Sequence, residues 1–172
     1  MSITELEKCI NMYGNDIYAF CLHLVYNQHE AEELYQDTFL KAMELLDGIE
    51  AGSNPKSYLL SITIRLWKNR KRKYAWRRRI AGIESLAEDG EEADIGSGYS
   101  LEEEVLRKEQ ARQLRRAVSA LDEKYRLPVY LYYMEDMAVS EIAGILKIPK
   151  GTVKSRLYKA REILKEKLAA DE

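Results

Sequence analysis

The sequence has few of the residues that build disulfide-linked or metal-dependent proteins. Only two of its 172 residues are cysteine and only two are histidine. Two cysteines are too few for a disulfide framework, and both fall in helical patterns, which favours reduced thiols. In principle the four residues offer a zinc ligand set: Cys9, Cys21, His23 and His29. Cys21 and His23 are two positions apart, however, and would point to different sides of a helix, so the spacing favours neither a metal site nor a cofactor.

Long apolar runs are also missing. No stretch comes near the roughly 18 residues that a membrane span requires, and the first residues, MSITELEKC, lack the basic-then-apolar layout of a signal peptide. We therefore expect a cytoplasmic protein with no membrane insertion of its own. The chain has no phosphate loop of Walker type and no HExxH, and the Gly-Ser-Gly at 96–98 is flanked by no strand pattern. The sequence accordingly predicts no catalytic residue.

The periodicity of the apolar residues predicts an all-α protein. Helical spacing runs through residues 10–26, 30–46 and 56–74, with breaks at Asn27 and at 47–55. A further helical region occupies the last part of the chain. Because no strand-type alternation of useful length occurs, we expect no sheet.

Charge is separated along the chain, although the net charge is only -2. Every charged residue from 56 to 79 is basic, whereas Asp and Glu dominate the stretch from 84 to 109. Blocks of opposite sign usually serve different purposes, and the Gly- and Glu-rich part has little periodicity. We therefore expect two small helical domains, residues 1–76 and 105–172, joined by a flexible acidic linker at 77–104.

The most informative segment, SEIAGILKIPKGTVKSRLYKAREIL at 140–164, predicts two short helices joined by a tight turn. Ser140 suits the N-cap of the first helix, and Pro149 suits the start of the second because it has no N–H to lose there. Lys147 falls at the turn, where we expect a left-handed backbone. Cationic and hydroxyl side chains crowd the outer faces of the second helix, as in a helix-turn-helix that enters the DNA major groove. The alternative is an amphipathic hairpin with a solvated basic face.

Three segments together resemble the extracytoplasmic-function sigma factors, the small two-domain class of bacterial RNA polymerase sigma subunits. They are AEELYQDTFLKAM at 31–43, NPKSYLLSITIRLWKNRKRK at 54–73 and LPVYLYYMEDMAVSEIAGILKIPKGTVKSRLYKAREIL at 127–164. The resemblance implies an alternative sigma factor that binds core polymerase and directs promoter-specific initiation by recognising the -35 and -10 elements and helping to melt DNA. It implies contacts with the clamp helices and flap of the polymerase, with promoter DNA and with an anti-sigma factor. It implies no enzyme activity, because the phosphodiester chemistry belongs to the polymerase core.

The resemblance also assigns surfaces to individual residues. A mainly acidic set with one aromatic residue matches the clamp-binding segment: Glu32, Glu33, Gln36, Asp37 and Phe39. We expect the aromatic side chain to be exposed, so that it can serve as an anchor in the partner. The simpler explanation for these acids is a solvated helix face. A largely basic set matches the -10 surface: Asn54, Lys56, Arg65, Lys68, Asn69, Arg70, Lys71 and Arg72. A basic and hydroxyl set matches the -35 helix: Lys150, Thr152, Lys154, Ser155, Arg156, Tyr158, Lys159 and Arg161.

The aromatic residues near the -10 set have two possible roles. Trp67, Tyr74 or Trp76 could stack on unpaired bases, although core packing explains Trp67 at least as well. Residues 47–54 match a loop that, in the family, captures a flipped base. The chain departs from the family pattern at three positions, with Tyr58 for a common Trp, Arg65 for Asn and Asn69 for Asp.

Two other functions remain open on the sequence. A two-domain helix-turn-helix regulator would bind DNA by itself and need another sigma subunit for transcription. A sigma factor would co-purify with core polymerase and start transcription without one. A helical adaptor with no DNA role fits poorly with two separate basic regions.

Overall fold

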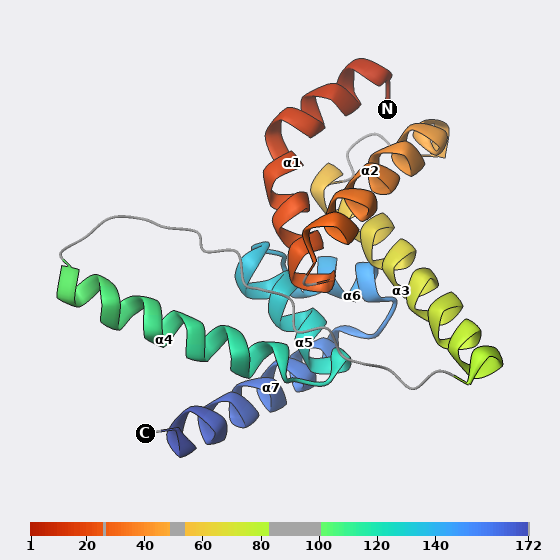
Figure 1. Ribbon diagram of the computed structural model, residues 1–172. Helices are drawn as coiled ribbons and strands as arrows, with labels where there is room; N and C mark the ends of the chain where they lie inside the picture. Colours follow the sequence, from red (N-terminus) through yellow and green to blue (C-terminus); the bar gives the residue numbers. More distant parts are fainter. Residues whose placement is uncertain (26, 49–53, 83–100, 172) are drawn as a thin grey trace. The chain divides into compact units, whose positions relative to one another are not determined.

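The regular structure of this chain is helical in every part that the structure describes. The computed structural model describes residues 1–25, 27–48, 54–82 and 101–171. The chain divides into two units, 1–93 and 94–172, and both contain helices without strands within the described ranges (Figure 1). The prediction of an all-α protein is confirmed.

Three long helices and one short turn form the N-terminal unit: α1 (Ile3–Val25), α2 (Gln28–Glu44), η1 (Leu46–Gly48) and α3 (Pro55–Ala81). The side chain of Asn27 starts α2 by accepting a hydrogen bond from the N–H of Glu30 at 3.2 Å. Asn54 does the same for α3, accepting from the N–H of Lys56 at 3.1 Å. Gly82 ends α3 with a left-handed backbone at φ 62°, which glycine adopts without strain.

The core of this unit lies where α1, α2 and α3 pack on one another. Its largest buried side chains come from all three helices: Ile17, Phe20, Leu34, Leu59, Leu60 and Ile62. A buried polar contact joins α2 to α3, because the hydroxyl oxygens of Thr38 and Thr63 lie 3.1 Å apart. Trp67 is only 4% exposed, so core packing explains it and base stacking does not.

The C-terminal unit contains α4 (Leu101–Ser119), α5 (Glu123–Val129), the π-helical turn η2 (Tyr130–Met134), α6 (Val139–Leu146) and α7 (Lys150–Ala170). Its core is mostly apolar and includes Leu127, Leu131, Ile142, Val153, Leu157 and Ala160. Helices α6 and α7 form the predicted helix-turn-helix. Lys147 has the expected left-handed backbone, with φ 55° and ψ 47°, and its N–H donates to the carbonyl of Ala143.

Two local expectations differ from the structure. Ser140 is not the N-cap of α6, because Ala138 takes that position and its N–H donates to the Glu141 carboxylate at 3.2 Å. A glutamate at the third position of a helix satisfies the backbone one turn earlier, so the helix begins before the serine. Helices also cover both ends of the segment expected as a linker at 77–104, since α3 continues to Ala81 and α4 begins at Leu101. The rest of that segment, 83–100, lies outside the described residues.

Candidate functional site

The outer face of α2 carries most of the residues matched to polymerase binding. Four of them are exposed there: Glu32, Glu33, Gln36 and Asp37. Phe39 is not the exposed anchor that we predicted. It is 7% exposed and packs edge-to-face against Tyr35, with the ring centroids 4.9 Å apart. Phe39 is thus part of the buried side of α2 and not of its exposed face.

Leu40 and Met43 supply the exposed apolar surface of α2 instead. Their side chains are 58% and 49% exposed. They are three positions apart, and Leu40 follows Gln36 by four, so these three side chains lie on one face of the helix. The sequence did not decide between Phe39 and Leu40, because neighbouring helix positions can both be buried, as Leu59 and Leu60 are.

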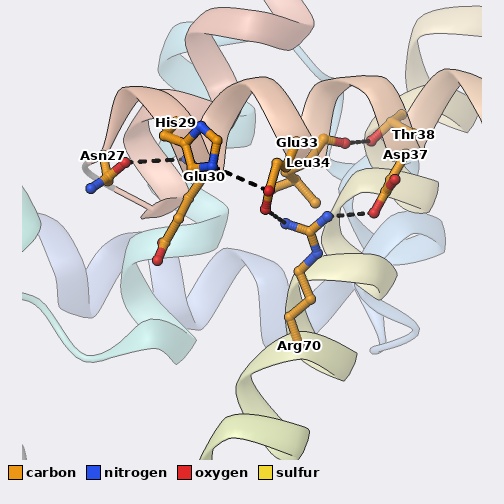
Figure 2. Close-up of polar contacts among 8 residues, drawn as sticks. All are labelled: Asn27, His29, Glu30, Glu33, Leu34, Asp37, Thr38 and Arg70. Carbon is orange, nitrogen blue, oxygen red and sulfur yellow. Dashed lines mark hydrogen bonds and ion pairs between the residues drawn. The ribbon is translucent and has the colours of Figure 1, made fainter.

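Arg70 of α3 reaches across to the acidic residues of α2. Its guanidinium donates a hydrogen bond to the Asp37 carboxylate and lies 3.9 Å from one oxygen of Glu33 (Figure 2). His29 lies 3.3 Å from the other oxygen of Glu33. Because all these groups are partly exposed, each ion pair contributes less than about 1 kcal/mol to folding. Their larger effect is to fix the positions of Asp37 and Glu33 on the surface of α2.

Two more cations of the -10 set also have partners inside the unit. The Lys56 ammonium lies 3.0 Å from a carboxylate oxygen of Asp16 on α1, and its side chain is only 14% exposed. The Lys71 ammonium lies 4.5 Å from the centre of the Trp67 ring. Lys56 therefore helps to hold α3 against α1, whereas Lys71 packs on a ring of its own helix.

The remaining members of the -10 set share one side of α3. They recur at spacings of three or four: Arg65, Lys68, Asn69 and Arg72. Arg65 and Arg72 are exposed, and the Arg72 guanidinium donates to the side-chain oxygen of Asn69. Asn54 is exposed at the start of the helix, where its side chain acts as the N-cap. Most of the predicted base-capturing loop, 49–53, lies outside the described residues.

The -35 set lies on the solvent side of α7, opposite its buried residues Val153, Leu157 and Ala160. Six members are exposed: Lys150, Lys154, Ser155, Tyr158, Lys159 and Arg161. The other two, Thr152 and Arg156, are half-buried. The Ser155 hydroxyl donates to the carbonyl of Thr152 at 3.0 Å. Helical spacing aligns one stripe along the helix: Lys150, Lys154, Tyr158 and Arg161.

Arg161 is held by a residue that the sequence reasoning missed. Its guanidinium donates a hydrogen bond of 2.8 Å to the hydroxyl of Tyr133 in η2. This bond raises the pKa of Arg161 above its ordinary value. Tyr133 in turn packs edge-to-face on Tyr132, with ring centroids 4.9 Å apart. No sequence pattern pointed to this contact, because the π-helical turn sets which way Tyr133 points.

The four possible zinc ligands of the sequence, Cys9, Cys21, His23 and His29, do not form a metal site among the described residues. None of their His, Cys, Asp and Glu side chains gather in groups of three or more that could hold a metal. Cys21 is fully buried in α1, whereas the His29 side chain is 81% exposed on α2. Burial raises the pKa of the Cys21 thiol to about 12, which keeps it protonated and a poor metal ligand. Within the described ranges, no helix is long and apolar enough to cross a membrane.

Comparison with known proteins agrees with this arrangement. Residues 9–77 match the family described as Sigma-70 region 2, and residues 111–164 match Sigma-70, region 4. The chain is 30% identical over 163 residues to the ECF RNA polymerase sigma factor SigW of Bacillus subtilis, covering 92% of this chain and 86% of the relative. The chain belongs to the extracytoplasmic-function sigma factors. It is also 27% identical to the ECF RNA polymerase sigma-E factor of Haemophilus influenzae, covering 92% of this chain and 85% of the relative.

A solved structure supports the same family. The sigma factor RpoE from Bartonella quintana, crystallised with the anti-sigma factor NepR, superimposes with a TM-score of 0.78 at 25% identity, covering 99% of this chain and all of that one. The sigma factor described here is thus an alternative sigma subunit that binds core RNA polymerase and directs transcription initiation. Sigma factors are initiation subunits and not enzymes in the usual sense.

Proposed function

We propose that this sigma factor divides its work among three helix faces. The α2 face docks on the clamp helices of the polymerase, the open side of α3 binds the -10 region, and α7 reads the -35 element while its unit rests on the flap. The observation that carries the proposal is the composition of these faces. An acidic and apolar surface on α2 is distinct from two basic surfaces, one in each unit of the chain.

The α2 face has the chemistry of a docking surface. Leu40 and Met43 offer exposed apolar area, and exposed carboxylates lie on the preceding turns of α2 at Glu32, Glu33 and Asp37. Apolar anchors accompanied by charges are typical of interaction sites in which the charges guide encounter and the anchors hold the complex. We assign Asp37 and Glu33 a double role, because Arg70 orients both of them.

The two basic faces differ in what they can read. The α7 stripe presents side chains that can reach base edges in a major groove, led by Lys154 and Tyr158. Lys and Ser lack the planar fork of Arg, so DNA shape contributes to discrimination at the -35 element. On α3, Arg65, Lys68 and Arg72 serve mainly to neutralise phosphates around the melted region.

We also infer that the sigma factor works in the cytoplasm, where polymerase and chromosomal DNA meet, and that an anti-sigma factor regulates it. The crystallised complex of the relative RpoE with NepR supports the second inference. A stand-alone helix-turn-helix regulator is disfavoured, since the match covers region 2 as well as region 4.

The polymerase-docking assignment is tested by substitutions that leave the internal ion pairs intact. Leu40→Ala combined with Gln36→Lys changes two exposed residues that take no part in the Arg70 pairs. We expect weakened binding to core polymerase with unchanged helical content. Glu7→Lys, an exposed charge change on α1, is the matched control and should bind normally. If core binding survives the double substitution, the α2 surface is not the docking site.

A further inference from the structure

The sulfur atoms of this chain fall into a buried group and an exposed group. Both cysteines, Cys9 and Cys21, are buried, and burial raises the pKa of each thiol. A buried, protonated thiol reacts slowly with oxidants. All five methionines lie within the described ranges, and three of them are exposed: Met12, Met43 and Met134. An oxidant that meets the folded protein therefore reaches thioethers before thiols.

Met43 differs from the other two exposed methionines in the surface to which it belongs. It lies on the proposed docking face of α2, three positions after Leu40 and seven after Gln36. Met12 is 69% exposed on α1, and Met134 is 43% exposed in η2. Met43 thus supplies one of the two apolar anchors of the docking face, and its sulfur is open to solvent until the polymerase covers it.

A peroxide, of which hydrogen peroxide is the simplest, is the oxidant that suits an exposed thioether. The sulfur lone pair attacks one peroxide oxygen, the O–O bond breaks and a sulfur–oxygen bond forms. The proton of the transferred oxygen passes to the departing hydroxide, which leaves as water. Methionine loses two electrons and the peroxide gains them. The product is a sulfoxide, which methionine sulfoxide reductases convert back to the thioether.

A sulfoxide at Met43 makes this part of the docking face polar. In the free sigma factor the new oxygen keeps its water, because the side chain is 49% exposed, so the fold is little affected. On docking, the same oxygen must lose its water without a partner prepared to replace it. A buried polar group left in this way weakens a complex by about 5- to 100-fold.

We propose that Met43 is an oxidation site through which peroxide weakens the docking of this sigma factor on core polymerase. This inference rests on the proposed docking role of the α2 face. The oxidised sigma factor stays folded, and it regains its affinity when the sulfoxide is reduced.

The test treats the full-length sigma factor with hydrogen peroxide, removes the oxidant and adds untreated core polymerase. Peptide mass mapping should find Met43 oxidised and both cysteines unmodified. We expect the affinity of the wild type for core polymerase to fall about 5- to 100-fold at unchanged helical content. Treatment with the two reductases that act on the two sulfoxide epimers should restore it.

Two variants assign the effect to one residue, each compared with its own untreated form. Met43→Leu keeps an apolar side chain that cannot form a sulfoxide, so its affinity should not change on treatment. Met12→Leu combined with Met134→Leu is the matched control, because it removes the other two exposed thioethers and keeps Met43. Its affinity should fall as much as that of the wild type.

Three results would overturn this inference. Met43 could escape oxidation, the treated Met43→Leu variant could lose affinity as the wild type does, or the loss could persist after the sulfoxides are reduced. Leu40→Ala, assayed without peroxide, tests the docking face separately. If Leu40→Ala weakens core binding but the response to peroxide does not depend on Met43, the docking face stands and the oxidation site is lost. If Leu40→Ala has no effect, the α2 face is not the docking site and the inference falls with it.

Discussion

Removal of the Tyr133 hydroxyl tests whether η2 positions a DNA-binding arginine. In the structure this hydroxyl accepts a hydrogen bond of 2.8 Å from Arg161, and both side chains are exposed. Tyr133→Phe keeps the ring and its packing on Tyr132 but frees the arginine. Since the bond is exposed to water, we expect a stability change of less than about 1 kcal/mol.

The effect on DNA binding should be larger than the effect on folding. A freed Arg161 must be immobilised again at the phosphate, which costs about 0.5 to 1.5 kcal/mol, or about two- to tenfold in affinity. The charge itself remains, so the dependence of affinity on salt should not change. Arg161→Ala removes the charge and should lower the slope of log affinity against log salt by about one unit.

Fluorescence anisotropy of the holoenzyme on a duplex containing the -35 element, measured at several salt concentrations, separates these outcomes. Tyr132→Phe, which removes the hydroxyl of the neighbouring ring, is the control. In an Arg161→Ala background, Tyr133→Phe should have no further effect. The reasoning is refuted if Tyr133→Phe leaves affinity unchanged, or if it weakens binding equally with and without Arg161.

Three further predictions concern the N-terminal unit. Phe39→Ala should lower the free energy of unfolding by about 3 to 5 kcal/mol, because it empties a buried site. Leu40→Ala should leave urea unfolding unchanged and weaken binding to core polymerase. The reverse pattern would contradict the burial of Phe39. Arg70→Ala should weaken binding to core polymerase, because Glu33 and Asp37 lose the group that orients them, and should leave the salt dependence of promoter binding as in the wild type. If the slope of log affinity against log salt instead falls by about one unit, Arg70 is a phosphate contact. Burial raises the pKa of Cys21 from 9.0 to about 12, so the folded state keeps this proton at a pH where the unfolded state loses it, and the thiol's contribution to stability declines as the pH rises above 9. Iodoacetamide at pH 8 should modify Cys21 only after unfolding, and rapid labelling of the native protein would contradict its burial.

Much of the fold could be predicted because local sequence signals and burial agree. Asn27 marks the start of α2 through its side-chain oxygen and Pro55 suits the start of α3 because it has no N–H, while Lys147 takes the left-handed turn despite its side chain. Phe39 was misjudged because a helix with a weak apolar pattern leaves the choice between Phe39 and Leu40 to tertiary packing. The partners of single charges could not be predicted either, since Arg70 meets Asp37 from 33 positions away along the chain.

The sequence predicted where the candidate residues lie on the helices better than which contacts each of them makes. Composition identified both basic regions, and every member of the -35 set lies on α7 with at least part of its side chain exposed. Composition could not show that Lys56 and Arg70 also hold α3 to α1 and α2. These contacts depend on distances between helices, which no periodicity encodes.

The central claim is that α7 reads the -35 element while α3 grips the -10 region. In vitro transcription with core polymerase, this sigma factor and no other sigma subunit, on a promoter library randomised at both elements, tests it most directly. We predict that Lys154→Ala changes which -35 bases are enriched and leaves the -10 preference as it was, while Arg65→Ala lowers yield from all promoters alike. The claim is contradicted if Lys154→Ala enriches the same -35 sequences as the wild type at a uniformly lower yield.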